Sequence, residues 1–107
     1  MDTLLKDGTI VDGSGQPPYT GCIWISGKKI KNILPTMPAD FVGEVIDCAG
    51  KIVTPGFIDG HSHNDWFALS DDQNLYFDPF ILQGITTFVS GNCGFSVSGY
   101  SAYCACK

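Results

Sequence analysis

The sequence has 107 residues, of which 44% are hydrophobic and 16% are charged, a composition typical of a folded domain rather than of a disordered tail. The net charge is −5 and the six Lys and Arg residues are scattered, so the chain lacks the basic patch that a nucleic-acid or anionic-membrane partner needs. No apolar run approaches the roughly 18 residues of a membrane span, and the N-terminus does not have the pattern of a secretory signal. We therefore expect a cytoplasmic protein with reduced cysteines.

The first half of the chain has the pattern of short strands joined by tight turns. Three hairpins are predicted, with strands at residues 4–6 and 9–11, 22–26 and 30–33, and 44–47 and 52–54. The pair Asp7-Gly8 favours a two-residue turn in which both central residues have positive φ. The glycines and prolines between these strands predict loops.

The pattern changes after residue 55. Buried strands are predicted at residues 57–61 and 85–89, and a short helix is predicted between them at residues 75–83. Pro79 would interrupt the helix and Gly84 would end it. The order strand, helix, strand is the unit of a parallel sheet with helices on its faces, so the fold class is predicted to be α/β.

Two histidines, His61 and His63, lie at the end of the first of these strands. Side chains two residues apart on a strand point to the same face, so the two imidazoles would lie close together at its carboxyl end. That arrangement suits two ligands of one divalent metal ion, and the carboxyl end of a barrel strand is where active sites lie. Two surface histidines would explain the same pattern without a metal, so both interpretations stay open on this motif alone.

Cys93 follows the second strand, beside Asn92 and between two glycines. A free cysteine is most often a small buried residue, whereas a thiolate next to a zinc ion is deprotonated and serves as a ligand. Asn92 and the flanking glycines favour a tight, exposed loop and therefore the ligand interpretation.

Residues 55–63, PGFIDGHSH, resemble the signature PGxIDxHxH of the metal-dependent amidohydrolase superfamily, in which this strand opens a (β/α)8 barrel. Residues 83–87, QGITT, and 91–94, GNCG, narrow the resemblance to the D-aminoacylase branch, the N-acyl-D-amino-acid deacylases. The first half is similar to the part of these enzymes that contributes to a small β-sandwich beside the barrel.

The resemblance implies a partial β-sandwich at residues 1–54 and the first strands of an incomplete (β/α)8 barrel at residues 55–107. It implies that Cys93 is a zinc ligand and that His61 and His63 line a neighbouring, weaker metal position. Asp59 and Asn92 are assigned to supporting positions around these ligands. For Asp59, a role as a strand-end cap or hydrogen-bond acceptor and a direct role on the metal both stay open.

The implied activity is zinc-dependent hydrolysis of the amide bond of small N-acyl-D-amino acids, with Zn²⁺ as cofactor. The alternatives are a related cyclic-amide hydrolase, similar to dihydroorotases and hydantoinases, and an inactive portion or binding module. A (β/α)8 barrel needs about 250 residues. We therefore expect this chain to be a truncated N-terminal portion with no identifiable catalytic acid or base. Because the edges of a two-stranded piece of a barrel are unpaired and apolar, we expect the isolated chain to aggregate, to oligomerise or to stay partly unfolded.

The other cysteines are not assigned a functional role. Cys22 stands where relatives often have an acidic residue, and Cys22 and Cys48 are predicted to be ordinary half-buried residues. The resemblance fades after Val97, so the pair Cys104 and Cys106 is predicted to lie in a frayed tail rather than to hold a soft metal.

Overall fold

The computed structural model describes residues 1–68, 70–94 and 96, which belong to two units that divide after Pro55. The first unit, Met1–Pro55, contains only strands, and the second, which begins at Gly56, combines strands with helices. The α/β class predicted from the sequence is therefore confirmed for the described residues.

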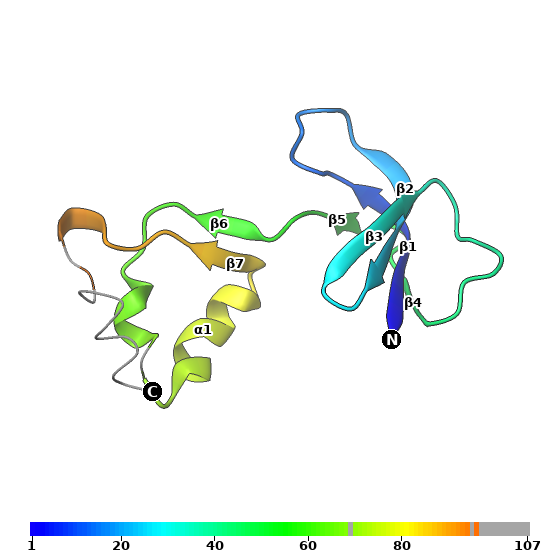
Figure 1. The fold of residues 1–107 in the computed structure, drawn as a ribbon. Helices are drawn as coiled ribbons and strands as arrows, with labels where there is room; N and C mark the ends of the chain where they lie inside the picture. The colour runs from blue at the N-terminus through cyan, green and yellow to red at the C-terminus, as the bar shows by residue number, and fades with distance from the viewer. Residues whose placement is uncertain (69, 95, 97–107) are drawn as a thin grey trace. The chain divides into compact units, whose positions relative to one another are not determined.

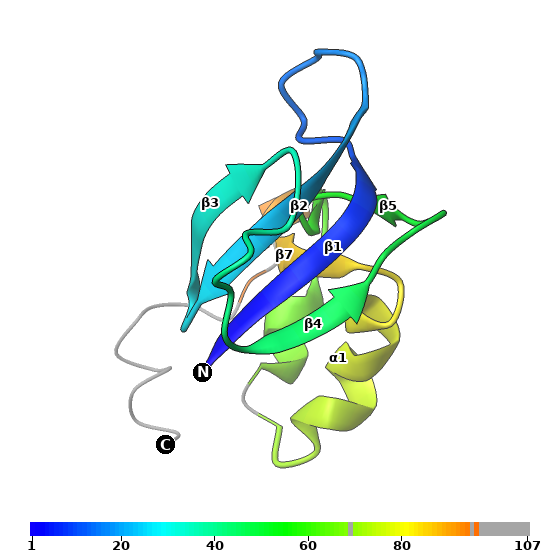
Figure 2. The same ribbon diagram turned by 90° about the vertical axis from the view of Figure 1, so that its right-hand side faces the viewer.

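Strand β1 is the centre of the first unit. Its sheet has the order β3-β2-β1-β4, with β5 also paired to β1 (Figure 2). β2 runs antiparallel to β1 and β3, whereas β4 and β5 run parallel to β1. The five strands are β1 (Asp2–Ile10), β2 (Tyr19–Ser26), β3 (Lys29–Leu34), β4 (Glu44–Asp47) and β5 (Ile52–Val53).

The predicted hairpin at Asp7-Gly8 is wrong, because β1 continues through both residues. The register with β2 shifts between Leu5 and Gly8, and Asp7 has φ of 57°. The positive φ that favours a hairpin turn is used instead in a β-bulge. A Cβ at position 8 would lie 2.6 Å from Cγ2 of Val53, so glycine also allows β5 to approach β1.

The third predicted hairpin is also wrong, whereas the second, β2–β3, is confirmed. β4 and β5 each pair with β1 and not with each other. The Cys48 N–H donates to the Lys6 carbonyl at 2.8 Å, and the Thr9 N–H donates to the Lys51 carbonyl at 2.9 Å. Residues 48–51 thus form a loop that connects β4 to β5 beside the bulge. β1 is long enough to pair with these two short strands in succession.

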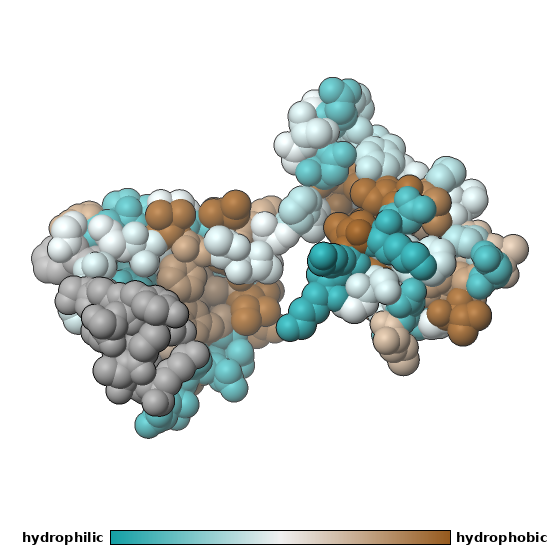
Figure 3. All heavy atoms as spheres, in the orientation of Figure 1, coloured by the Kyte–Doolittle hydropathy of each residue, from teal (hydrophilic) through white to brown (hydrophobic). Residues whose placement is uncertain are grey.

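The core of the first unit is small and lies along β1 and β2. Five hydrophobic side chains are buried: Leu4, Ile10, Cys22, Ile23 and Cys48. Cys22 and Cys48 are therefore more buried than the sequence suggested. A cavity of about 420 Å³ remains beside this core, lined mainly by isoleucines of β2 and β3 together with Leu5, Val53 and Pro55. Hydrophobic side chains also reach the surface of this unit (Figure 3).

The second unit has the predicted order of strand, helix and strand (Figure 1). Strands β6 and β7 are parallel, and helix α1 connects them. The helix is not interrupted: Pro79 lies inside it, and Gly84, with φ of 83°, follows its end. The elements are β6 (Phe57–Asp59), the 3-10 turn η1 (Asn64–Phe67), α1 (Gln73–Ile81), β7 (Ile85–Phe88) and the 3-10 turn η2 (Asn92–Gly94).

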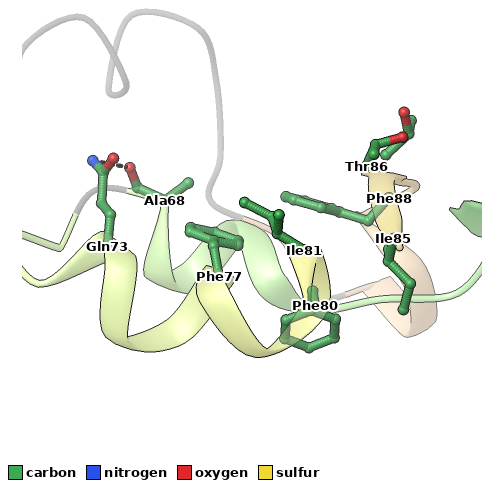
Figure 4. Close-up of a pocket in the computed structure, with 9 residues that line it drawn as sticks. Ala68, Gln73, Phe77, Phe80, Ile81, Ile85, Thr86 and Phe88 are labelled. Carbon is green, nitrogen blue, oxygen red and sulfur yellow. Dashed lines mark hydrogen bonds between the residues drawn. The ribbon is translucent and has the colours of Figure 1, made fainter. Parts of the chain in front are cut away.

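The prediction that both strands are buried is wrong. Phe57 is 56% exposed and Ile58 is 69% exposed, because a single helix covers only part of a two-stranded sheet. Phe77 of α1 stacks on Phe88 of β7 with ring centroids 5.7 Å apart. These two rings border a cavity of about 330 Å³ between helix and strand (Figure 4). None of the helices that the structure describes is long and apolar enough to cross a lipid bilayer.

Candidate metal centre

The loops that follow β6 and β7 lie side by side, because parallel strands end at the same edge of their sheet. The Val89 N–H donates to the Asp59 carbonyl at 2.8 Å, and the Ser62 N–H donates to the Val89 carbonyl at 3.0 Å. These bonds continue the pairing beyond both strands. They bring the segment that holds both histidines next to the segment that leads to Cys93.

The three predicted ligands come together at this edge. One ligand atom from each of His61, His63 and Cys93 can be chosen so that all three lie within 4.8 Å of one another. Nε2 of His61 is 3.5 Å from Sγ of Cys93, and the two imidazole centroids are 5.7 Å apart at an interplanar angle of 73°. All three side chains are exposed, so a metal ion and a substrate have access to them.

The sequence pattern predicted that His61 belongs to the strand itself. In the structure, neither histidine does. β6 ends at Asp59, so both imidazoles belong to the following loop. The loop is turned by two side chains that accept backbone hydrogen bonds. Oδ1 of Asp59 accepts from the His61 N–H at 3.1 Å, and Oγ of Ser62 accepts from the Asn64 N–H at 3.0 Å.

Asp59 and Asn92 both hold loop backbone near the ligands. Asp59 caps the strand end through its bond to the His61 N–H, and it is not among the residues whose ligand atoms cluster in the described chain. The Asn92 side-chain amide donates to the carbonyls of Val89 and Ser62, at 2.8 and 3.2 Å. Asn92 therefore joins the two loops.

Ser62 is a residue that the sequence analysis missed. It stands between the two histidines and is 5% exposed, and it is the only buried residue in the described part of the second unit. A serine between two polar residues gives no periodic signal of burial. The only hint is its ability to accept a hydrogen bond from a backbone N–H two residues later, a common turn of serine.

Cys93 has an unusual backbone conformation for a residue with a side chain. Its φ is 58°, and it is followed by Gly94 with φ of 73° and preceded two residues earlier by Gly91 with φ of 79°. A left-handed conformation at a non-glycine residue costs about 1–3 kcal/mol, and such residues concentrate at functional sites. The two glycines were the signal of this tight turn in the sequence.

The donor set consists of one thiol and two imidazoles, which are ligands for zinc and other transition metals. Thiolate and imidazole ligands suit zinc, whereas magnesium and calcium prefer oxygen ligands. Three protein ligands are the number found in catalytic zinc sites, where the fourth position is left for water or substrate. Cys22 and Cys48 belong to the core of the first unit, and Cys104 and Cys106 lie outside the described residues.

Comparison with known protein families and with curated proteins relates the chain to metal-dependent hydrolases of amide bonds. The model of a family described as the amidohydrolase family matches residues 44–103. The N-acyl-D-aspartate deacylase of Alcaligenes xylosoxydans xylosoxydans is 38% identical over 100 residues, which are 94% of this chain and 19% of that protein.

Solved structures give the same result. A D-aminoacylase structure that concerns the functional role of a binuclear metal centre has a TM-score of 0.80 and 37% identity, covering 91% of this chain and 20% of that chain. An N-acyl-D-glutamate deacylase from Bordetella bronchiseptica, complexed with zinc and a phosphonate inhibitor, has a TM-score of 0.77 and 35% identity over the same shares. This chain therefore spans about a fifth of the length of the relatives it matches.

Proposed function

The chain belongs to the amidohydrolase family, and on that premise we propose that it supplies part of the zinc centre of an N-acyl-D-amino-acid deacylase. The observation that carries this proposal is the approach of His61 Nε2 to Cys93 Sγ at 3.5 Å, with His63 beside them, at the carboxyl edge of two parallel strands. The similarity to deacylases of N-acyl-D-aspartate and N-acyl-D-glutamate supports the substrate class.

In this proposal, His61, His63 and Cys93 hold the metal ion. Bound zinc would supply a Lewis acid that polarises the amide carbonyl of the substrate. The exposed side of the cluster admits the N-acyl amino acid, and Asp59 fixes the backbone N–H of His61. We propose that a carboxylate transfers a proton to the departing amine. The products are a carboxylate and a free D-amino acid.

The proposal extends to the architecture. The parallel pair β6–β7 with helix α1 between its strands is the repeat from which a (β/α)8 barrel is built, and barrel active sites lie at the carboxyl ends of the strands. We assign residues 55–107 to the start of such a barrel and residues 1–54 to part of a β-sandwich. The cytoplasmic location predicted from the sequence stays a prediction.

Metal content and activity together test the proposal. The 107-residue chain is expected to retain stoichiometric zinc after dialysis, and Cys93→Ala is expected to lose it, as measured by elemental analysis. Activity is measured on the product of the complete reading frame that contains these residues. Release of a free D-amino acid from N-acetyl-D-aspartate or N-acetyl-D-glutamate supports a deacylase, whereas ring opening of a hydantoin without deacylation would establish a cyclic-amide hydrolase instead.

A further inference from the structure

We infer that Ser62 and Asn92 form a clamp that sets the spacing of the three candidate ligands before a metal ion binds. The clamp consists of the buried Ser62, the side-chain amide of Asn92 and the Val89 carbonyl. Its importance for zinc affinity rests on the proposed function, but its existence in the metal-free chain does not.

Ser62 is held from three sides. Its N–H donates to the Val89 carbonyl at 3.0 Å, its carbonyl accepts from the Asn92 amide at 3.2 Å, and its Oγ accepts from the Asn64 N–H at 3.0 Å. Because Ser62 lies directly between His61 and His63 in the chain, fixing its backbone restricts both imidazoles. Its 5% exposure means that little water competes for these bonds.

The Asn92 amide connects the two loops through a single side chain. Its Nδ2 donates to the Ser62 carbonyl in the histidine loop and to the Val89 carbonyl at the end of β7. Asn92 is also the residue immediately before Cys93, which has φ of 58° and an exposed side chain. The same side chain therefore fixes the position of the thiol relative to the histidines.

A site with fixed ligands binds metal more tightly, because binding does not have to order the loops that carry them. Loss of a hydrogen-bonding partner outside the ligand set typically lowers metal affinity by about 10–100-fold. Neither Ser62 nor Asn92 is among the three clustered ligand residues, so both are positioning residues. Their replacement should weaken metal binding without changing the donor atoms.

The first experiment uses the metal-free chain and follows the exchange of single amide hydrogens by NMR. In Asn92→Ala, the Ser62 amide is expected to exchange at least about tenfold faster than in the wild type, because only backbone hydrogen bonds then hold its loop to the segment after β7. In Asn74→Ala, a matched change at an exposed position in α1, the rate is expected to stay unchanged. A wild-type rate in Asn92→Ala would overturn the clamp.

The second experiment measures metal affinity by competition with a chromophoric chelator. Asn92→Ala is expected to bind zinc about 10–100-fold more weakly than Asn74→Ala. At saturation with Co²⁺ it should show the same thiolate-to-metal absorption as the wild type, since Cys93 remains. Equal affinities of the two variants would overturn the positioning role.

A third variant, Ser62→Ala, keeps the test decisive if Asn92→Ala does not fold. It removes only the Oγ acceptor, so faster exchange at the Asn64 amide and weaker zinc binding are expected. Wild-type values for both would overturn the inference. Failure of the wild-type chain to bind zinc would instead refute the proposed function, and the exchange rates in the metal-free chain would still decide whether the clamp exists.

Discussion

Nε2 of His61 and Sγ of Cys93 lie 3.5 Å apart although the two residues are 32 positions apart in the chain. The two side chains belong to loops that follow different strands, so their approach depends on the register between β6 and β7. In that register Ile58 pairs with Thr87 and Asp59 pairs with Phe88. Any change that disturbs this pairing should separate the imidazole from the thiol.

Replacing Cys93 by serine should remove the spectroscopic signature of the site. A thiolate ligand gives Co²⁺ a near-ultraviolet charge-transfer absorption that two imidazoles alone do not give. We expect Cys93→Ser to lose this absorption. We also expect its zinc affinity to fall by more than the roughly 10–100-fold that loss of a partner outside the ligand set typically costs.

The two cysteines that lie outside the described residues provide the control. A double variant, Cys104→Ser with Cys106→Ser, should keep both the absorption and the affinity. An absorption that survives in Cys93→Ser and disappears in the double variant would show that the thiolate ligand lies in the last residues of the chain.

Gly56 should not tolerate a side chain. A Cβ at this position would overlap the side chain of Thr86 on the neighbouring strand. Overpacking of this kind typically costs about 1–3 kcal/mol, so Gly56→Ala should lower the free energy of unfolding of the second unit by that amount. Urea denaturation followed by Trp66 fluorescence measures it, in a variant whose other tryptophan, Trp24, is replaced by phenylalanine.

Gly60 is the matched control for Gly56. A Cβ built at Gly60 meets no heavy atom within 4 Å, and Gly60 has no positive φ. Gly60→Ala should therefore leave the free energy of unfolding unchanged within about 0.5 kcal/mol. Equal destabilisation by both substitutions would contradict the packing of β6 against β7 described above.

Asp2 should make the stability of the first unit depend on pH in acid. The hydroxyl of Ser26 donates to its Oδ1 at 2.8 Å and the Trp24 indole N–H donates to its Oδ2 at 2.6 Å. These bonds, that of Ser26 foremost, lower the pKa of the Asp2 carboxyl below its ordinary value of 3.8. A lowered folded-state pKa means that the stabilisation is present above pH 3.8 and is lost as the pH falls below it.

The Asp2→Asn variant tests this dependence. We expect the wild type to lose stability between pH 5 and the acid limit more steeply than the variant, as measured by urea denaturation followed by Trp24 fluorescence in a Trp66→Phe background. Parallel pH profiles for the two proteins would show that the two hydrogen bonds do not stabilise the charged carboxylate of Asp2 relative to its protonated form.

The first unit should self-associate through the exposed face of β3. Ile30 is 63% exposed and Ile33 is 42% exposed, and β3 is an edge strand of its sheet. Apolar edge strands pair readily with other chains. Sedimentation velocity should show concentration-dependent association that the double variant Ile30→Lys with Ile33→Lys reduces.

Val42 supplies the control for this change. It is 86% exposed and lies outside the strands of the sheet, so Val42→Lys adds positive charge without touching β3. Association should persist in Val42→Lys. If this variant dissociates as completely as the β3 variant, the added charge and not the strand face controls association.

The elements of the second unit followed from the sequence more closely than those of the first. The β-branched residues 85–89, the glycine at position 84 and the polar segment before the helix are local signals, and the parallel β6–β7 pair with its helix is confirmed. The partners of β4 and β5 depend instead on residues about 40 positions earlier in the chain. No local pattern distinguishes pairing with β1 from pairing with each other, so the hairpin prediction failed there.

The candidate site also combines features that local sequence signals predicted with features that depend on contacts between distant residues. The types and spacing of His61, His63 and Cys93 were visible in the sequence, and so was the tight turn around Cys93. The burial of Ser62 and the two hydrogen bonds of the Asn92 amide depend on how the two loops meet. Such contacts between distant segments leave no periodic trace in the sequence.

The central position of β1 has a consequence for synthesis on the ribosome. β1 emerges before all three of its partners, and two of them, β4 and β5, end only at Asp47 and Val53. At roughly 5–20 residues per second, a nascent chain would expose one edge of β1 for a few seconds. During that interval the bulge at Asp7 and Gly8, which bends and twists the strand, would hinder its pairing with neighbouring nascent chains.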